Sequence, residues 1–251
     1  MARVTQALIL AGGLGTRLRA VFEDMPKPMA PVLGRPVLEH QVLALRDAGV
    51  RDVVLCVGHL GEMIEHHFGD GGRLGVRVRY ARERELLGSG GAIANARGEL
   101  AQGPFFALNG DTLIPDVDYA AFAAGHARHR QADGATVGSL LVVRPADAGE
   151  YGVVDIAEDA GIVAFREKAP VDPAKVLISG GIYLLEQAVF DYIPAGRKVS
   201  IEFEVFPSVI EHGGHLWAYE HTGFFGDIGT PDGYERVCRH LEAAQAEKDG
   251  S

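Results

Sequence analysis

The feature that most constrains the fold is an alternation of short apolar runs with segments of helical spacing in the first half of the chain. Residues 7–11, 53–57 and 105–108 are continuous apolar runs, which are typical of strands buried on both faces of a parallel sheet. Residues 36–48 and 90–97 have the spacing of helices. Because strands that alternate with helices imply right-handed crossovers, we predict an α/β fold with a parallel, doubly wound sheet.

The second half of the chain is less regular, and we expect its strands to extend this sheet into a mixed one. The sequence shows no Ser/Gly-rich linker, low-complexity tract or internal repeat, which indicates one domain. The remaining predicted elements are helices at 61–68 and 231–247 and strands at 76–80, 136–143, 152–156, 162–166 and 178–185.

Composition excludes some classes of partner. A formal net charge of -10 argues against a nonspecific nucleic-acid binder, which would present a basic face. A phosphorylated substrate remains compatible, because anion sites depend on local cations and backbone N–H groups. The chain has no apolar run of membrane-spanning length and no signal-peptide pattern. Cys56 and Cys238 lie far apart and are predicted to be free thiols. We therefore expect a cytoplasmic protein without membrane partners.

A Gly-rich turn at residues 11–18 follows the first predicted strand. Glycines at the carboxyl end of a strand let backbone N–H groups approach phosphate oxygens, although a tight turn alone would also use them. Leu18 stands where a dinucleotide fingerprint needs its third glycine, and no Gly-Lys-Ser/Thr follows. Instead Arg17 closes the turn, and Lys27 lies between two prolines. A cation held by rigid prolines suits a polyphosphate.

These segments carry a resemblance that extends over essentially the whole chain. Residues 10–18, 26–29 and 34–36 resemble the signature of the nucleoside-diphosphate-sugar pyrophosphorylases. The resemblance implies a Rossmann-like, doubly wound, mixed sheet of the nucleotide-diphospho-sugar transferase type. It also implies a nucleotidyltransferase that joins a nucleoside triphosphate to a sugar 1-phosphate and releases pyrophosphate. Residues 1–251 would form one domain, with a nucleotide-binding lobe at about 1–115 and 223–247 and a sugar-binding lobe at about 116–222.

The resemblance also implies roles for charged residues. Arg17 would hold the β and γ phosphates, Lys27 would stabilise charge at the α-phosphate, and Asp111 and Asp227 would bind Mg²⁺. From the residues alone, Asp111 is equally a turn residue, and Asp227 precedes a helix start with Thr230 as N-cap. The positions that would contact the nucleotide are Leu10, Ala11, Gly12, Gly13, Gly15, Thr16, Arg17, Glu83, Glu85, Gly88, Ser89 and Gly110.

Residues 87–93 resemble the family's loop that holds the base. Glu83 or Glu85, just before this loop, can accept two N–H bonds from guanine, which favours GTP as the donor. On the sugar side, the resemblance assigns Lys168 to the phosphate of the sugar 1-phosphate. Taken alone, Arg166-Glu167-Lys168 is typical of a solvated charge run. The predicted sugar-phosphate positions are Gly152, Glu167, Lys168, Gly180, Gly181 and Glu202.

Within the family the chain is most similar to the D-glycero-α-D-manno-heptose 1-phosphate guanylyltransferases. N-acetylmuramate 1-phosphate uridylyltransferases and enzymes for mannose or glucose 1-phosphate stay open as alternatives. A noncatalytic regulatory subunit that binds a nucleotide sugar is a further alternative, disfavoured because the phosphate cations and metal carboxylates are present. Oligomeric state, including a homo-oligomer, is left open. The ten histidines show no metal-ligand spacing, and His66, His67, His126 and His129 are expected to be solvated or capping residues on surface helices.

Overall fold

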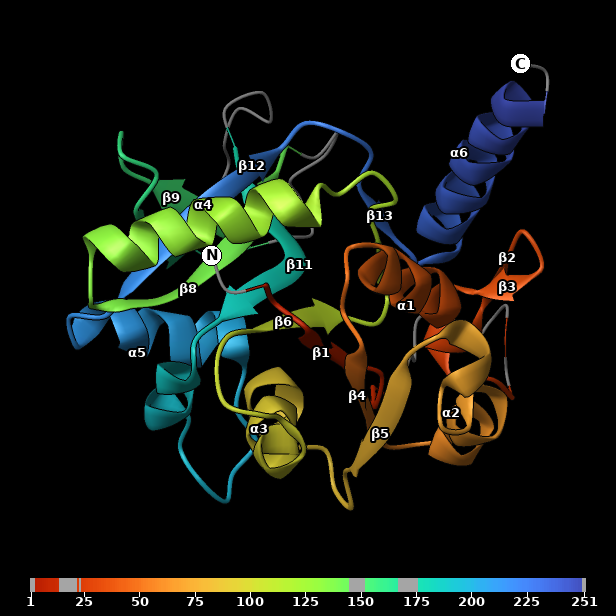
Figure 1. The fold of residues 1–251 in the computed structure, drawn as a ribbon, viewed down its shortest axis with the longest axis horizontal. Helices are drawn as coiled ribbons and strands as arrows, with labels where there is room; N and C mark the ends of the chain where they lie inside the picture. The colour runs from red at the N-terminus through yellow and green to blue at the C-terminus, as the bar shows by residue number, and fades with distance from the viewer. Residues whose placement is uncertain (1–2, 14–21, 23, 145–151, 167–175, 250–251) are drawn as a thin grey trace.

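The structure is a computed structural model that describes residues 3–13, 22, 24–144, 152–166 and 176–249. Within these residues a nine-stranded sheet runs through the molecule (Figure 1). Its order is β10-β9-β11-β6-β1-β4-β5, with β8 paired to β11 and β12 paired to β8. The strands of the first half are β1 (Gln6–Leu10), β4 (Asp52–Val57), β5 (Arg77–Arg82) and β6 (Phe105–Asn109).

These four strands form the parallel part of the sheet, as the apolar runs predicted. β1 pairs in parallel with β4 and β6, and β4 pairs in parallel with β5. Leu8 and Ile9 point to opposite faces of the sheet, and both are fully buried. Burial on both faces is the reason that these strands have continuous rather than alternating apolar sequences.

The second half makes the sheet mixed. β11 (Ile178–Leu185) runs antiparallel to β6 and β8 (Thr136–Val143), and β9 (Val153–Ile156) pairs antiparallel with β10 (Ile162–Arg166). The sequence did not predict β12 (His215–His221), which pairs in parallel with β8. Much of β12 is only half-buried, so it carries neither a continuous apolar run nor a clean alternation.

Helices cover both faces of the sheet, and two clusters of buried side chains fill the space between. α1 (Val37–Asp47), α2 (Gly61–Phe68) and α4 (Tyr119–Ala132) contribute to one cluster. α3 (Gly88–Asn95) and α5 (Phe206–Glu211) contribute to the other (Figure 1). The arrangement confirms the α/β, doubly wound prediction. One sheet contains strands of both predicted lobes. The division into a nucleotide-binding lobe and a sugar-binding lobe therefore stays a prediction.

The last helix, α6 (Pro231–Asp249), lies beside the small sheets rather than on the main one (Figure 1). Val237 packs with residues of β2 (Pro31–Val32) and β7 (Thr112–Leu113) in a third, smaller cluster. The hydroxyl of Thr230 accepts a hydrogen bond from the Gly233 amide at 3.2 Å, so the predicted N-cap is confirmed. The other short strands are β3 (Arg35–Pro36) and β13 (Gly226–Asp227). No helix in the described ranges is long and apolar enough to span a bilayer.

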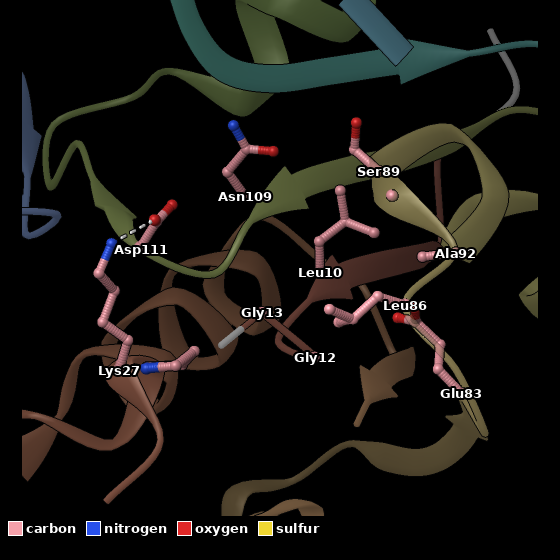
Figure 2. A pocket seen from close by; sticks show the side chains of 12 residues that line it. Leu10, Gly12, Gly13, Lys27, Glu83, Leu86, Ser89, Ala92, Asn109 and Asp111 are labelled. Atoms are coloured by element: carbon pink, nitrogen blue, oxygen red, sulfur yellow. Dashed lines mark hydrogen bonds and ion pairs between the residues drawn. The ribbon is translucent and has the colours of Figure 1, made fainter. Parts of the chain in front are cut away.

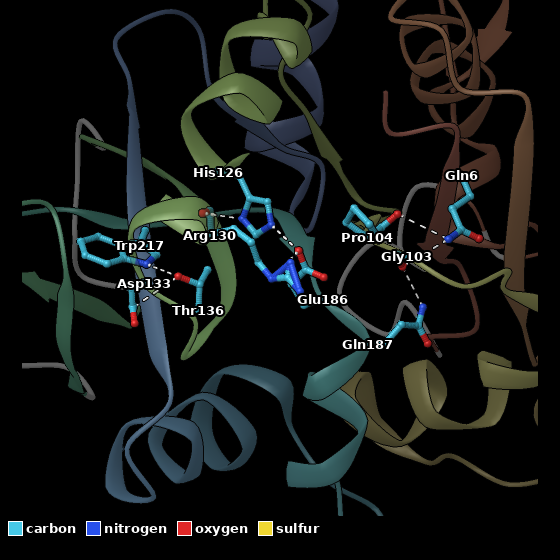
Figure 3. Close-up of polar contacts among 11 residues, drawn as sticks. Gln6, Gly103, Pro104, His126, Arg130, Asp133, Thr136, Glu186, Gln187 and Trp217 are labelled. Atoms are coloured by element: carbon cyan, nitrogen blue, oxygen red, sulfur yellow. Dashed lines mark hydrogen bonds and ion pairs between the residues drawn. The ribbon is translucent and has the colours of Figure 1, made fainter. Parts of the chain in front are cut away.

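One histidine prediction is wrong. His126 is buried on α4, with Nδ1 2.9 Å from the Ser139 hydroxyl and Nε2 3.2 Å from Glu186 (Figure 3). The helix turns this position toward the sheet, where the ring needs polar partners because it cannot reach water. His129, one turn on, stacks on Trp217 with ring centroids 4.0 Å apart. The two cysteines are free thiols, as predicted.

Candidate active site

A cavity of about 230 Å³ opens where β1 and β6 end (Figure 2). Leu10 and Asn109, the last residues of these two strands, both line it. Because the carboxyl ends of parallel strands meet at one edge, open α/β sheets place their ligands there. The residues that line the cavity are Leu10, Gly12, Gly13, Lys27, Pro28, Glu83, Leu86, Gly88, Ser89, Ala92, Asn109 and Asp111.

One end of the cavity carries an ion pair between residues that lie far apart in the sequence. Lys27 Nζ lies 3.0 Å from Asp111 Oδ2, and the Lys27 side chain is only 10% exposed. Figure 2 shows this pair on one side of Leu10, with Glu83 and Ser89 on the other. A sheltered ammonium beside a carboxylate is fixed in place, which suits it to neutralise an anionic ligand.

Local sequence explains the position of Lys27. The residue opens a short 3-10 helix, η1 (Lys27–Met29), and the Met29 amide donates to the Pro26 carbonyl at 2.8 Å. Pro28 packs close to Gly110, where a Cβ atom would lie 3.2 Å from the proline Cγ and 2.6 Å from the Leu10 carbonyl oxygen. Only glycine permits this close approach, and the approach brings η1 next to Asp111.

Asp227 comes to the same edge from the opposite end of the chain. β13 pairs antiparallel with β7, so that Asp227 lies opposite Thr112, and the Ile228 amide donates to the Asp111 carbonyl at 2.9 Å. The backbones that carry Asp111 and Asp227 are therefore neighbours. Mg²⁺ binds through one or two carboxylates and completes its shell with water and substrate phosphates. Asp111 lines the cavity and could supply one such ligand, whereas Asp227 does not line it and its Oδ1 accepts from the Gly229 amide at 2.5 Å.

The other end of the cavity is built by Glu83 and the start of α3. Burial raises the pKa of Glu83, and the Leu87 amide, which donates to Oε2 at 3.1 Å, partly offsets the rise. Ser89 lines the cavity while its hydroxyl accepts from the Ile201 amide at 2.9 Å. Glu83 thus shares this end of the cavity with apolar Leu86 and Ala92, a mixture of apolar lining and a few polar groups that is typical of small-molecule sites.

The described residues of the predicted sugar side form a second group. The Tyr183 hydroxyl donates to Glu202 Oε1 at 2.6 Å, and burial together with Glu202 raises the pKa of this tyrosine well above its usual value. Glu202 lies on the π-helical turn η6 (Ile201–Val205), and such turns are frequent at functional sites. Gly152 faces the exposed ring of Phe203 at the same turn.

The structure gathers part of the predicted site. Leu10, Gly12, Gly13, Lys27, Glu83, Gly88, Ser89 and Asp111 line the cavity. Ala11 is buried behind it, Glu85 is exposed and does not line it, and Gly110 lies beneath Asp111 against Leu10 and Pro28. The space beside Gly180 is filled by Leu141, and that beside Gly181 by Asn109. The predictions for Gly15, Thr16, Arg17, Glu167 and Lys168 concern positions outside the described residues.

Sequence reasoning missed four lining residues: Pro28, Leu86, Ala92 and Asn109. Asn109 ends an apolar strand in the sequence Asn-Gly-Asp, and that position was the available signal. Leu86 and Ala92 are apolar residues without any distinguishing pattern, so only their place in the fold assigns them to the cavity.

The fold and this site define an α/β protein with a cavity at the carboxyl edge of its sheet and a sheltered lysine at one end of that cavity. Comparison with known proteins gives the family. The model of the family described as Nucleotidyl transferase matches residues 6–244, and the chain belongs to that family.

Two guanylyltransferases are among the similar proteins. The mannose-1-phosphate guanylyltransferase of Mycobacterium tuberculosis is 38% identical over 94% of this chain and 64% of its own length. The mannose-1-phosphate guanylyltransferase catalytic subunit beta of Xenopus tropicalis is 37% identical over 96% of this chain and 66% of its own length. The chain thus spans about two thirds of the length of these curated relatives.

Solved structures agree with the family. HddC from Yersinia pseudotuberculosis is 30% identical, covers 95% of this chain and all of its own, and has a TM-score of 0.79. HddC has also been crystallised with GMP-PN. The inositol-1-phosphate CTP transferase of T. maritima, at 19% identity and a TM-score of 0.73, covers 92% of each chain and shares the fold.

Proposed function

We propose that this protein is a sugar-1-phosphate guanylyltransferase that converts GTP and a sugar 1-phosphate to a GDP-sugar and pyrophosphate. The observation that carries the proposal is the layout of the cavity. The Lys27–Asp111 pair lies at one end beside the strand that carries Asp227, and Glu83 lies at the other. A nucleotide placed along this cavity has its phosphates at the cationic end and its base at Glu83.

The proposed preference for guanine depends on Glu83. A carboxylate only accepts hydrogen bonds, and guanine presents two adjacent donors, N1–H and N2–H, on its Watson–Crick edge. The Leu87 amide bonded to Oε2 orients the carboxylate. The guanylyltransferase names of the two relatives and the GMP-PN bound by HddC support the same base.

In the proposed reaction an oxygen of the sugar phosphate attacks the α-phosphorus, the new P–O bond forms, and the bond to the β-phosphate breaks. The attacking phosphate is already an anion, so the chain needs to supply position and positive charge rather than a strong base. Lys27 would hold charge at the α-phosphate, and Asp111 and Asp227 would hold Mg²⁺. When bound, Mg²⁺ supplies further positive charge to the phosphates.

For the sugar we propose a manno-configured 1-phosphate. The predicted D-glycero-α-D-manno-heptose 1-phosphate has this configuration, and so does mannose 1-phosphate, the substrate in the names of the two relatives. The Tyr183–Glu202 pair offers a carboxylate for the hydroxyls that the two sugars share.

The test is a matrix assay with Mg²⁺, in which each of GTP, ATP, CTP, UTP and dTTP is paired with each sugar 1-phosphate of a panel. The panel contains the manno-heptose, mannose, glucose and N-acetylmuramate forms, and pyrophosphate release and product mass are read together. Turnover confined to GTP with one manno-configured sugar is the expected result. Turnover of UTP with N-acetylmuramate 1-phosphate would contradict the base and the sugar. Nucleotide binding without turnover in any pair would favour the regulatory class.

A further inference from the structure

The buried side-chain amide of Gln41 binds the backbone on both sides of Asp111, the proposed metal ligand. Gln41 lies on α1 and is only 4% exposed. Its Nε2 donates to the carbonyl of Asn109 at 2.8 Å and to the carbonyl of Thr112 at 2.6 Å. These two residues flank Gly110 and Asp111, so a single side chain holds both ends of the loop that presents Asp111.

Two backbone hydrogen bonds also hold this loop, each at a single residue. The Gly110 amide donates to the Leu10 carbonyl at 3.0 Å, which ties the loop to β1. The Ile228 amide donates to the Asp111 carbonyl, which ties the loop to the residue after Asp227. Gln41 adds the bonds from α1 and makes them to both ends of the loop at once. The two carbonyls stay fixed relative to each other because one planar NH₂ group binds both.

We infer that Gln41 is a positioning residue for Asp111: it sets the place of that carboxylate relative to Lys27 and Asp227. The inference rests on the proposed function, in which Asp111 and Asp227 hold the metal. Partners that orient a metal ligand without touching the metal commonly change metal affinity or activity by 10- to 100-fold when removed. Gln41 itself does not line the cavity and, in the proposal, does not touch the substrate.

Gln6 provides a matched control, because it binds the loop before β6, whereas Gln41 binds the loop after β6. Gln6 is 5% exposed, and its Nε2 donates to the carbonyl of Ala101 at 3.0 Å and lies 3.4 Å from the carbonyls of Gly103 and Pro104 (Figure 3). Gln6 thus braces the loop that enters β6, whereas Gln41 braces the loop that leaves it. Both are buried amides on backbone carbonyls, and only one of them adjoins Asp111.

The experiment compares Gln41→Met, Gln41→Asn and Gln6→Met with the unmodified chain, using Mn²⁺ as the metal probe. With GTP fixed and sugar phosphate omitted, the thermal midpoint is followed as Mn²⁺ is raised, which gives a half-saturating concentration without any turnover. We expect this concentration to rise about tenfold or more in Gln41→Met and to be unchanged in Gln6→Met. In Gln41→Asn, whose shorter amide cannot span both carbonyls, we expect a rise as well. Steady-state assays should show a lower kcat with little change in the KM for GTP.

Each outcome decides a separate point. If Gln41→Met has the Mn²⁺ dependence of Gln6→Met, Gln41 is a structural residue and the inference is wrong. If Gln41→Met does not fold, Gln41→Asn gives the same decision by the same readout. If the unmodified chain turns over no pair in the matrix assay but the contrast in Mn²⁺ dependence persists, the proposed reaction fails and the role of Gln41 stands.

Discussion

Lys27 and Asp111 hold each other at the edge of the cavity, and each has a charge that the proposed reaction needs. Asp111 is more than a third exposed, so the ion pair itself adds little to stability. We therefore expect Lys27→Met and Asp111→Asn to lower kcat by about 10²- to 10³-fold while the protein stays folded. Initial rates and thermal midpoints measure the two effects separately.

The control for this prediction is Asp52→Asn. Asp52 pairs with Arg77 at 2.7 Å at the opposite end of the parallel strands, where β4 begins. Its loss removes a comparable ion pair without changing the cavity. Near-normal turnover in Lys27→Met, or an equal loss in Asp52→Asn, would count against the assigned site.

Burial raises the pKa of Glu83 above the usual value of 4.5, which predicts that the stability of the protein depends on pH. Between pH 4.5 and the raised pKa the folded state binds more protons than the unfolded state, so the free energy of unfolding falls as pH rises through this window. Glu83→Gln removes this titration. We expect the variant to be more stable than the wild type at about pH 7.5 and equal to it near about pH 4. Urea unfolding at both values measures the difference.

The same substitution tests the role in base binding. Glutamine replaces one of the two acceptors by a donor, so the KM for GTP should rise even though the protein is more stable. A stability difference that does not vary with pH would show that Glu83 is not the titrating group, and an unchanged KM would remove it from the base site.

Among the elements, β11 carries a local irregularity that reaches the site. The register between β11 and β8 shifts between Ser179 and Tyr183, and Gly181 within it has φ +68°. A Cβ at Gly181 would lie 2.8 Å from Asn109 Nδ2. We expect Gly181→Ala to cost roughly 1–3 kcal/mol of stability and to reduce kcat as well, because Asn109 lines the cavity. Chemical denaturation and initial rates test the two parts.

The substitution Gly196→Ala is a control that separates the effect of backbone strain from the effect of displacing Asn109. Gly196 has φ +71°, and a Cβ added at this position would meet no described atom within 4 Å. Gly196→Ala should therefore lose similar stability from strain alone and keep its turnover. Equal kcat values for the two alanine variants would mean that Asn109 does not depend on the β11 irregularity.

How far the sequence predicts these elements depends on their burial. β1, β4 and β6 were predicted to within a residue or two, since strands covered on both faces must be apolar throughout. β12 was missed because it is half-buried and pairs with β8 across more than 70 residues, and periodicity carries no information about such pairings. Gln41 was missed for a related reason: a buried polar residue on a helix shows its role only through its partners.

At the scale of the whole molecule, the proposed site draws on segments from both ends of the chain. β1 and η1 come from the first thirty residues, the Asp111 loop comes from the middle, and β13 comes from the last thirty. β7 and β13 join the middle to the end directly. Ligand binding in this cavity therefore engages contacts across the fold and should stabilise the whole domain rather than one loop.

That coupling gives the last prediction. A ligand present at about 100 times its Kd stabilises the folded state by about 2.7 kcal/mol, which for a domain of this size raises Tm by roughly 5–10 °C. We expect such a rise for GTP with Mg²⁺, a smaller rise for ATP, CTP, UTP and dTTP at the same concentration, and a reduced GTP effect when EDTA removes the metal. Asp111→Asn should lose the metal-dependent part, and Glu83→Gln should lose the difference between GTP and the other nucleotides. Equal shifts for all five nucleotides would contradict the guanine preference, and a GTP shift that EDTA leaves intact would contradict the Asp111–Asp227 metal site.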